Sequence, residues 1–215
     1  MQSLDFNVQC DPDDINKVTP YALAQLHRYV EENDLNYNVY YKNEGYPGLY
    51  WKFIGLLVFL YGKLNKDFYT RFQTRVTNAS SKDILFPSRK THGDHTQLTV
   101  YRTLRHELVH IRDARTYPVW FQVSYTLLPI PLGLAYFRAD WEFRAYAQTL
   151  IVTYNQYGSI DEEMIQQIVK HFTDHLYFWM WPFKKTMDRK VRALVKAIEE
   201  GRVYGYYPNI HIWQF

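Results

Sequence analysis

The segment from about Thr96 to Arg115 constrains the fold more than any other part of the chain. Its apolar residues recur every three to four positions, which predicts an amphipathic helix, and it contains His106-Glu107-Leu108-Val109-His110. Residues four apart lie on one face of a helix, so both imidazoles can reach one metal ion. Glu107 lies about 100° round the helix from His106, where its carboxylate can meet a water on that ion. This is the arrangement that metal-assisted hydrolysis needs.

Glu142 is a second acidic residue that could have a metal ion as its partner. It lies between Trp141 and Phe143 on a second predicted helix, so its carboxylate is expected to be buried. A buried carboxylate without a partner is costly, and a metal ion is a suitable partner. The alternative role for Glu142 is a salt bridge with Arg138 or Arg144.

Asp113 is the competing ligand, because it follows His110 by three residues and lies on the same helical face. Three ligands on one straight helix would diverge from a single ion. The spacing therefore favours a hydrogen bond from a ligand imidazole to Asp113 over direct ligation.

These residues resemble those of the zincin metallopeptidases. The metzincin continuation is absent, because the chain reads Ile111-Arg112-Asp113-Ala114-Arg115 after the second histidine. The run from Arg138 to Ala147 is similar to the glutamate helix of the gluzincins, in which the ligand Glu is followed by a small residue three positions later. Glu142 and Ala145 match this pattern, and Tyr146 stands where an Asp is common.

The resemblance covers about Tyr101 to Ala147 and implies a zinc-dependent peptidase. Zn²⁺ would be held by His106, His110 and Glu142, and Glu107 would act as general base and then as general acid. Substrates would be peptides or proteins, and an extended peptide would pair with a strand edge near Asp67–Val76 or Ile84–Phe86. Further side chains could orient a ligand or stabilise an oxyanion, namely Asp113, Tyr146, Arg144, Tyr101, His92 and His95. His171 and His175 are also four apart, but no Glu follows His171, so this pair is a weaker candidate site.

The remaining pattern predicts an α+β, mostly helical fold with a small sheet of two to four strands packed on the motif helix. Helices are expected over Pro20–Glu32, Leu49–Leu64 (buried), Thr96–Arg115, Arg138–Tyr154, Asp161–Trp181 and Lys184–Glu200. Strands are expected over Asn36–Tyr41, Asp67–Val76 and Ile84–Phe86, and a polar loop over Ser88–Asp94. We expect a single zincin-like domain over residues 1–215, with a motif core at about 67–154, a helical part at 160–200 and a tail at 201–215.

Composition narrows the class of protein. The chain has 215 residues, is 47% hydrophobic, carries a net charge of +3 and contains one cysteine. It is too apolar to be disordered, and its basic residues are too dispersed for a nucleic-acid-binding arm. A single cysteine cannot form an intrachain disulfide, and the polar first residues do not form a secretory signal. These features predict a cytoplasmic protein.

The uncharged stretch at residues 117–137 raises the question of membrane contact. A single span there would place His110 and Glu142 on opposite sides of a bilayer, where they could not share a metal. Pro118, Pro129 and Pro131 also interrupt a helix. We expect a packed connection, with peripheral membrane contact as the alternative.

Two further hypotheses about function stay open. The site could stabilise a binding or scaffold protein that lacks turnover. The peptidase could also be latent, with the aromatic tail and its His211 in the cleft.

Overall fold

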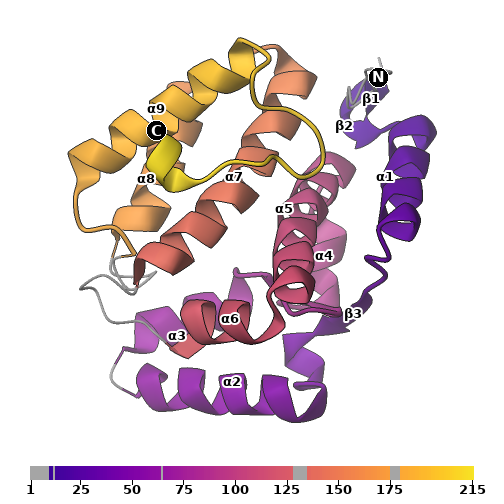
Figure 1. The fold of residues 1–215 in the computed structure, drawn as a ribbon. Coiled ribbons are helices and arrows are strands. Elements are labelled where there is room, and N and C mark those ends of the chain that lie inside the picture. The colour runs from indigo at the N-terminus through magenta and orange to yellow at the C-terminus, as the bar shows by residue number, and fades with distance from the viewer. Residues whose placement is uncertain (1–9, 12, 64, 128–134, 175–179) are drawn as a thin grey trace.

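The computed structural model describes residues 10–11, 13–63, 65–127, 135–174 and 180–215. Two long helices, α5 (Gln97–Thr116) and α7 (Ala135–Tyr157), pack against each other at the centre of the molecule (Figure 1). They are surrounded by α1 (Pro20–Glu32), α2 (Gly48–Gly62), α3 (Lys66–Thr74), α4 (Arg89–Asp94), α6 (Pro118–Gln122), α8 (Glu162–Thr173) and α9 (Lys184–Glu199). Short helical turns lie at Lys42–Glu44, Val123–Leu127 and Ile212–Gln214. The α+β, mostly helical class is confirmed.

The strands form two small sheets. A hairpin of β1 (Cys10–Asp11) and β2 (Asp14–Val18), which the sequence did not predict, precedes α1. The second sheet has the order β3 (Asn38–Tyr41), β5 (Asp83–Phe86), β4 (Asn78–Ala79). β3 runs parallel to β5, and β4 runs antiparallel to it. The predicted strands over Asn36–Tyr41 and Ile84–Phe86 are confirmed, but β5 is central, so it offers no edge to a peptide.

Side-chain caps explain where three helices begin. The Thr19 hydroxyl accepts a hydrogen bond from Ala22 N at 3.3 Å, and the Thr96 hydroxyl accepts one from Thr99 N at 3.2 Å. The Asp161 carboxylate accepts one from Met164 N at 2.7 Å. Such caps satisfy backbone donors that have no partner within the helix. The predicted starts of α1, α5 and α8 are confirmed.

The predicted strand over Asp67–Val76 is wrong, because this segment forms α3. The alternation of apolar residues that indicated a strand also includes Phe68 and Phe72, which are four apart and fit a helix. The Asn65 side chain caps the helix by accepting from Phe68 N at 3.0 Å, and Phe72 is its buried residue.

Two other boundaries differ from the prediction. The expected loop over Ser88–Asp94 contains α4, whose first turn is capped by the Ser88 hydroxyl. The helix expected to reach Trp181 ends at Thr173, where Asp174 adopts an extended conformation. Residues 175–179, including His175, lie outside the described part of the chain.

The segment Leu49–Leu64 was predicted to be a buried helix, and only half of that prediction is right. α2 is helical, and its residues Trp51, Val58 and Gly62 are buried. Its other face is exposed, with Leu49 at 85% exposure. α2 lies along one edge of the molecule rather than inside it (Figure 1).

Among the described residues, buried side chains gather in three clusters around the central helix pair. The largest joins α7, α8, α9 and the C-terminal tail. A second joins α1, the β3–β5 sheet and one face of α5. A third, small cluster contains Ala114, Phe121 and Trp141, and it packs α6 against both central helices. These clusters pack around α5 and α7 and hold the two helices in place. They thereby position the side chains that lie between the two helices.

Within the part of the chain that the structure describes, no helix has the length and apolarity needed to cross a bilayer. Residues 117–127 form α6 and the turn Val123–Leu127, in which Phe121 is buried and Val119 is 75% exposed. Residues 128–134 of the uncharged stretch lie outside the described part.

Candidate metal centre

The central helices bring the three predicted metal ligands together. His106 and His110 lie one turn apart on α5, and Glu142 faces them from α7. His106 Nε2 is 3.6 Å from Glu142 Oε2, and His110 Nε2 is 3.7 Å from Glu142 Oε1. One ligand atom from each residue lies within 4.8 Å of the other two. His110 and Glu142 thus lie side by side, although they are 32 positions apart in the sequence.

The spacing of these atoms fits a small metal ion. A tetrahedral zinc ion with bonds of about 2.1 Å would place its ligand atoms about 3.4 Å apart. The observed separations of 3.6 and 3.7 Å are close to this value and too long for direct hydrogen bonds. Two imidazoles and a carboxylate are also a donor set that zinc favours. The three side chains are therefore close enough together to bind one metal ion.

Neighbouring side chains orient the three ligands. The Thr149 hydroxyl lies 3.1 Å from His106 Nδ1, which leaves His106 Nε2 directed at Glu142. The Tyr125 hydroxyl donates a hydrogen bond to Glu142 Oε1, and its ring packs edge-on against His110. Sequence reasoning missed Tyr125 and Thr149. Thr149 could have been found, because it lies seven residues after Glu142 and so on the same face of α7.

Burial and charge shift the pKa values of the ligands. Burial raises the pKa of Glu142, but the adjacent His110 and His106 imidazoles outweigh it and lower that pKa well below its usual range. Burial lowers the pKa of His110 to about 4. Both shifts favour the forms that bind a metal, an ionised carboxylate and a neutral imidazole. For His106, burial lowers the pKa, and the Glu142 and Glu107 carboxylates more than reverse this effect.

Glu107 lies beside the ligands in a buried position. It is 5% exposed, and its Oε2 atom has no hydrogen-bond partner. Burial raises its pKa to about 7, which the charge of His106 opposes. A carboxylate in this state can exchange a proton near neutral pH.

Lys42 is a second buried charge near Glu107. Its ammonium group donates to the carbonyl oxygens of Phe72 and Val76, both at 2.7 Å, and lies 3.8 Å from the centre of the Phe72 ring. Burial lowers the pKa of Lys42 to about 7, and the charge of Glu107 partly offsets this effect.

The predicted supporting residues mostly lie elsewhere. The Asp113 carboxylate forms an ion pair with Arg144 at 3.2 Å and accepts a hydrogen bond from Tyr207, so the predicted bond to a ligand imidazole is wrong. This pairing also takes Arg144 away from the metal ligands. Burial is the main cause that raises the pKa of Asp113 to about 6.

Tyr146 and the loop histidines were further candidates. The Tyr146 ring packs edge-on against His106, and its hydroxyl lies 2.7 Å from His171 Nδ1. His92 stacks on Phe86 in the sheet cluster, and His95 is exposed after α4. Tyr101 contacts Arg105 and lies in the α1–α5 cluster. Tyr146 is therefore the member of this group that contacts a predicted ligand, His106.

In the contacts of the described residues, the tail meets α7 at Asp140, Arg144 and Gln148. His211 Nδ1 lies 2.8 Å from Asp140 Oδ2, and Tyr207 contacts Arg144 and Asp113. Asp140 and Arg144 point away from Glu142 on the turns of α7. The one imidazole of the tail is thus bound outside the metal centre.

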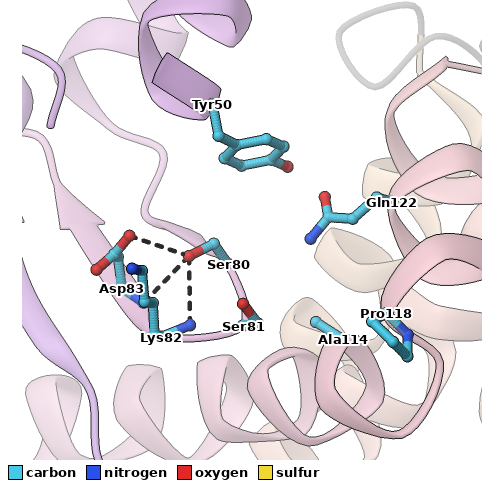
Figure 2. Close-up of a pocket in the computed structure, with 8 residues that line it drawn as sticks. All are labelled: Tyr50, Ser80, Ser81, Lys82, Asp83, Ala114, Pro118 and Gln122. Atoms are coloured by element: carbon cyan, nitrogen blue, oxygen red, sulfur yellow. Dashed lines mark hydrogen bonds between the residues drawn. The ribbon is translucent and has the colours of Figure 1, made fainter. Parts of the chain in front are cut away.

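A cavity of about 240 Å³ lies one turn beyond His110 on α5, between α2, α6 and the β4–β5 turn (Figure 2). It is lined by Tyr50, Ser80, Ser81, Lys82, Asp83, Ala114, Pro118 and Gln122. Gln122 extends into it from α6, and its buried Oε1 atom has no hydrogen-bond partner. The buried Asp83 carboxylate accepts hydrogen bonds from Trp51, Ser80 and Asn38.

No family model matches this chain, and the searches of curated proteins and of solved structures also gave no match. The expected likeness to zincins therefore rests on the motif residues of the sequence.

Proposed function

We propose that this protein is a gluzincin-like zinc metallopeptidase. The observation that carries the proposal is the approach of Glu142 to His106 and His110 across two helices, with Glu107 buried next to them. The spacing of these residues in the sequence is compatible with this arrangement. Two packed helices could equally well direct Glu142 away from the histidines, so the approach is informative. We also propose a cytoplasmic location, because the single cysteine cannot form an intrachain disulfide, and we predict no nucleic-acid partner.

The residues of the chain would divide the work as follows. Zinc, when bound by His106, His110 and Glu142, would supply Lewis-acid activation of the scissile carbonyl and of water. Glu107 would take a proton from the attacking water on its carboxylate and deliver it to the nitrogen of the leaving amine. Tyr125 would keep Glu142 in its binding orientation through the hydrogen bond to Oε1.

The peptide would lie along β4. This strand is an edge of its sheet, runs antiparallel to β5 and contacts α5. An extended peptide can add to such an edge through backbone hydrogen bonds. The cavity lined by Gln122 and Tyr50 starts at the turn that follows β4, so it could receive a substrate side chain. This placement replaces the predicted edges at Asp67–Val76 and Ile84–Phe86.

The test combines metal analysis with Glu107→Gln. We expect about one zinc per chain in both proteins, and peptide hydrolysis that falls by several orders of magnitude in the variant. Glu199→Gln is the matched control, because Glu199 is exposed on α9, and it should keep full activity. Equal hydrolysis by wild type and Glu107→Gln would remove Glu107 from the mechanism.

A zinc-stabilised scaffold is the second candidate, and the burial of the centre favours it. The side chains of His106, His110 and Glu142 are only 14%, 5% and 6% exposed. A scaffold predicts bound zinc, a lower melting temperature after chelation and no hydrolysis of any peptide in a mixed library. Hydrolysis that depends on Glu107 would exclude it.

A further inference from the structure

Helix α2 carries two apolar faces, and the protein covers one of them. Trp51, Val58 and Gly62 point to the interior. The opposite face forms a stripe with spacings of four, three and four residues, as expected for one side of a helix. It consists of Leu49, Phe53, Leu56 and Leu60, which are 85%, 46%, 53% and 49% exposed.

The neighbours of this stripe widen the apolar surface. Tyr50 and Leu57 lie on one side of it, each 37% exposed, and Phe59 lies on the other at 48%. A helix that is apolar all round is normally buried on all sides. Contiguous apolar surface of this kind marks a contact site on a folded protein. The outer face of α2 therefore needs a partner.

The charges on and beside α2 indicate the chemistry of that partner. Residues 46–66 contain Lys52, Lys63 and Lys66 and no acidic residue. Lys63 lies over the Phe59 ring at 5.1 Å, at the margin of the stripe. An apolar strip bordered by lysines and aromatic rings suits the boundary between acyl chains and anionic headgroups. A second copy of α2 fits less well, because its lysines would meet lysines without an acidic residue to pair with.

The dimensions of α2 favour a helix that lies on the bilayer. Its 15 residues extend about 22 Å, which is less than the roughly 30 Å hydrocarbon core. The helix lies along the edge of the molecule, where its outer face can approach a plane without obstruction by α3 or α6 (Figure 1). We propose that α2 docks flat on an anionic lipid surface through Leu49, Phe53, Leu56 and Leu60, with Lys52 and Lys63 contacting headgroups.

The test is sedimentation of the full-length protein with vesicles of phosphatidylcholine, with and without added phosphatidylglycerol. We expect binding to the anionic vesicles that weakens as salt is added. The combined change Leu49→Gln, Phe53→Gln, Leu56→Gln and Leu60→Gln should weaken this binding at least about a hundredfold. The matched control is Phe183→Gln with Trp213→Gln, which alters two residues that are each 66% exposed and lie outside α2. It should bind as wild type does.

A charge reversal provides an independent measurement with the stripe intact. Lys52→Glu with Lys63→Glu should weaken binding to anionic vesicles at least about tenfold, and far-ultraviolet circular dichroism should be unchanged. The proposal is overturned if the wild-type protein ignores anionic vesicles, or if the stripe variant binds them as well as wild type does. Dimers in sedimentation analysis that the stripe variant abolishes, without vesicle binding, would identify a second copy as the partner and also overturn it.

Discussion

At the scale of single residues, metal binding at the candidate centre would depend on how Glu142 is held. Its Oε1 atom faces His110 and also accepts a hydrogen bond from Tyr125. A carboxylate with this second contact loses less rotational freedom when it binds a metal. Residues that orient ligands in this way typically contribute about 10- to 100-fold to metal affinity.

We therefore expect Tyr125→Phe to weaken zinc binding about 10- to 100-fold, because the ring stays in place and only the hydroxyl is lost. Competition with a chromophoric chelator measures this affinity. Tyr204→Phe, at a residue that is 69% exposed, is the control and should bind zinc as wild type does. Unchanged affinity in Tyr125→Phe would show that Glu142 is positioned by the backbone and the imidazoles alone.

Lys42 should make the free energy of unfolding depend on pH. Its pKa is lowered from 10.5 to about 7 in the folded protein by burial. Between these values the unfolded chain binds more protons than the folded one, so stability rises with pH over this window. Below about pH 7 both states are charged, and the full penalty of burying the ammonium remains.

Lys42→Met should remove this pH dependence. The slope of the free energy of unfolding against pH should then change by up to about 1.4 kcal/mol per pH unit. Urea unfolding of both proteins at several pH values between 7 and 10 would measure it, with the chelator present throughout so that zinc does not contribute. Lys66→Met is the control, since Lys66 is exposed at the start of α3. Parallel slopes for wild type and Lys42→Met would show that burial does not lower the pKa of Lys42.

At the scale of elements, the sequence predicted helices best where a side chain caps them. Thr19, Thr96 and Asp161 each fix a start, because the hydrogen bond that they make is local. Alternation of apolar residues indicated a strand where α3 forms, because that alternation also places Phe68 and Phe72 four apart, on one face of a helix. The exposure of α2 was missed for another reason, since apolar sequence does not reveal which face the rest of the chain covers.

The contact between α5 and α7 contains a buried polar link that should be important for stability. Arg105 is 1% exposed and donates to Gln148 Oε1 from Nε at 2.9 Å and from Nη2 at 2.6 Å. Gln148→Leu would keep the volume and remove the acceptor, which leaves a buried cation with fewer partners. We expect a loss of about 2–4 kcal/mol of stability.

Chemical denaturation would measure this loss, with Gln167→Leu on the exposed face of α8 as the control. The control should change stability by less than about 0.5 kcal/mol. A similar small change in Gln148→Leu would mean that Tyr101 and the Gly205 carbonyl satisfy Arg105 without it.

At the scale of the whole molecule, the sequence identified three candidate ligands that lie close together, but it did not identify the side chains around them. His106 and His110 share a helix, and the composition around Glu142 predicted a buried helix, so local patterns sufficed for these three. Tyr125 and Tyr207 contact Glu142 and Asp113 across large separations in sequence. Such contacts depend on tertiary packing. The sequence therefore could not show that Asp113 pairs with Arg144 and Tyr207 instead of with a ligand imidazole.

The position of the tail, residues 201–215, bears on the hypothesis that the peptidase is latent. A tail that blocks the cleft predicts that its removal raises activity. The structure gives the tail a different place, since Tyr206, Ile210 and Ile212 are 6%, 5% and 0% exposed in the clusters around α5 and α7. Burying each such side chain contributes about 1.5–3 kcal/mol, a large share of the 5–15 kcal/mol that typically separates folded and unfolded states.

Deletion of residues 205–215 should therefore lower the melting temperature sharply and not raise peptide hydrolysis. Ile212→Ala is a milder change that should cost about 2–5 kcal/mol while the metal ligands stay in place. Trp213→Ala, at an exposed neighbour, should have little effect on stability. The decisive comparison is activity per folded molecule, measured below the unfolding transition of each variant. A rise in Ile212→Ala or in the deletion, with zinc content unchanged, would show that the tail restrains the enzyme as well as completing its core.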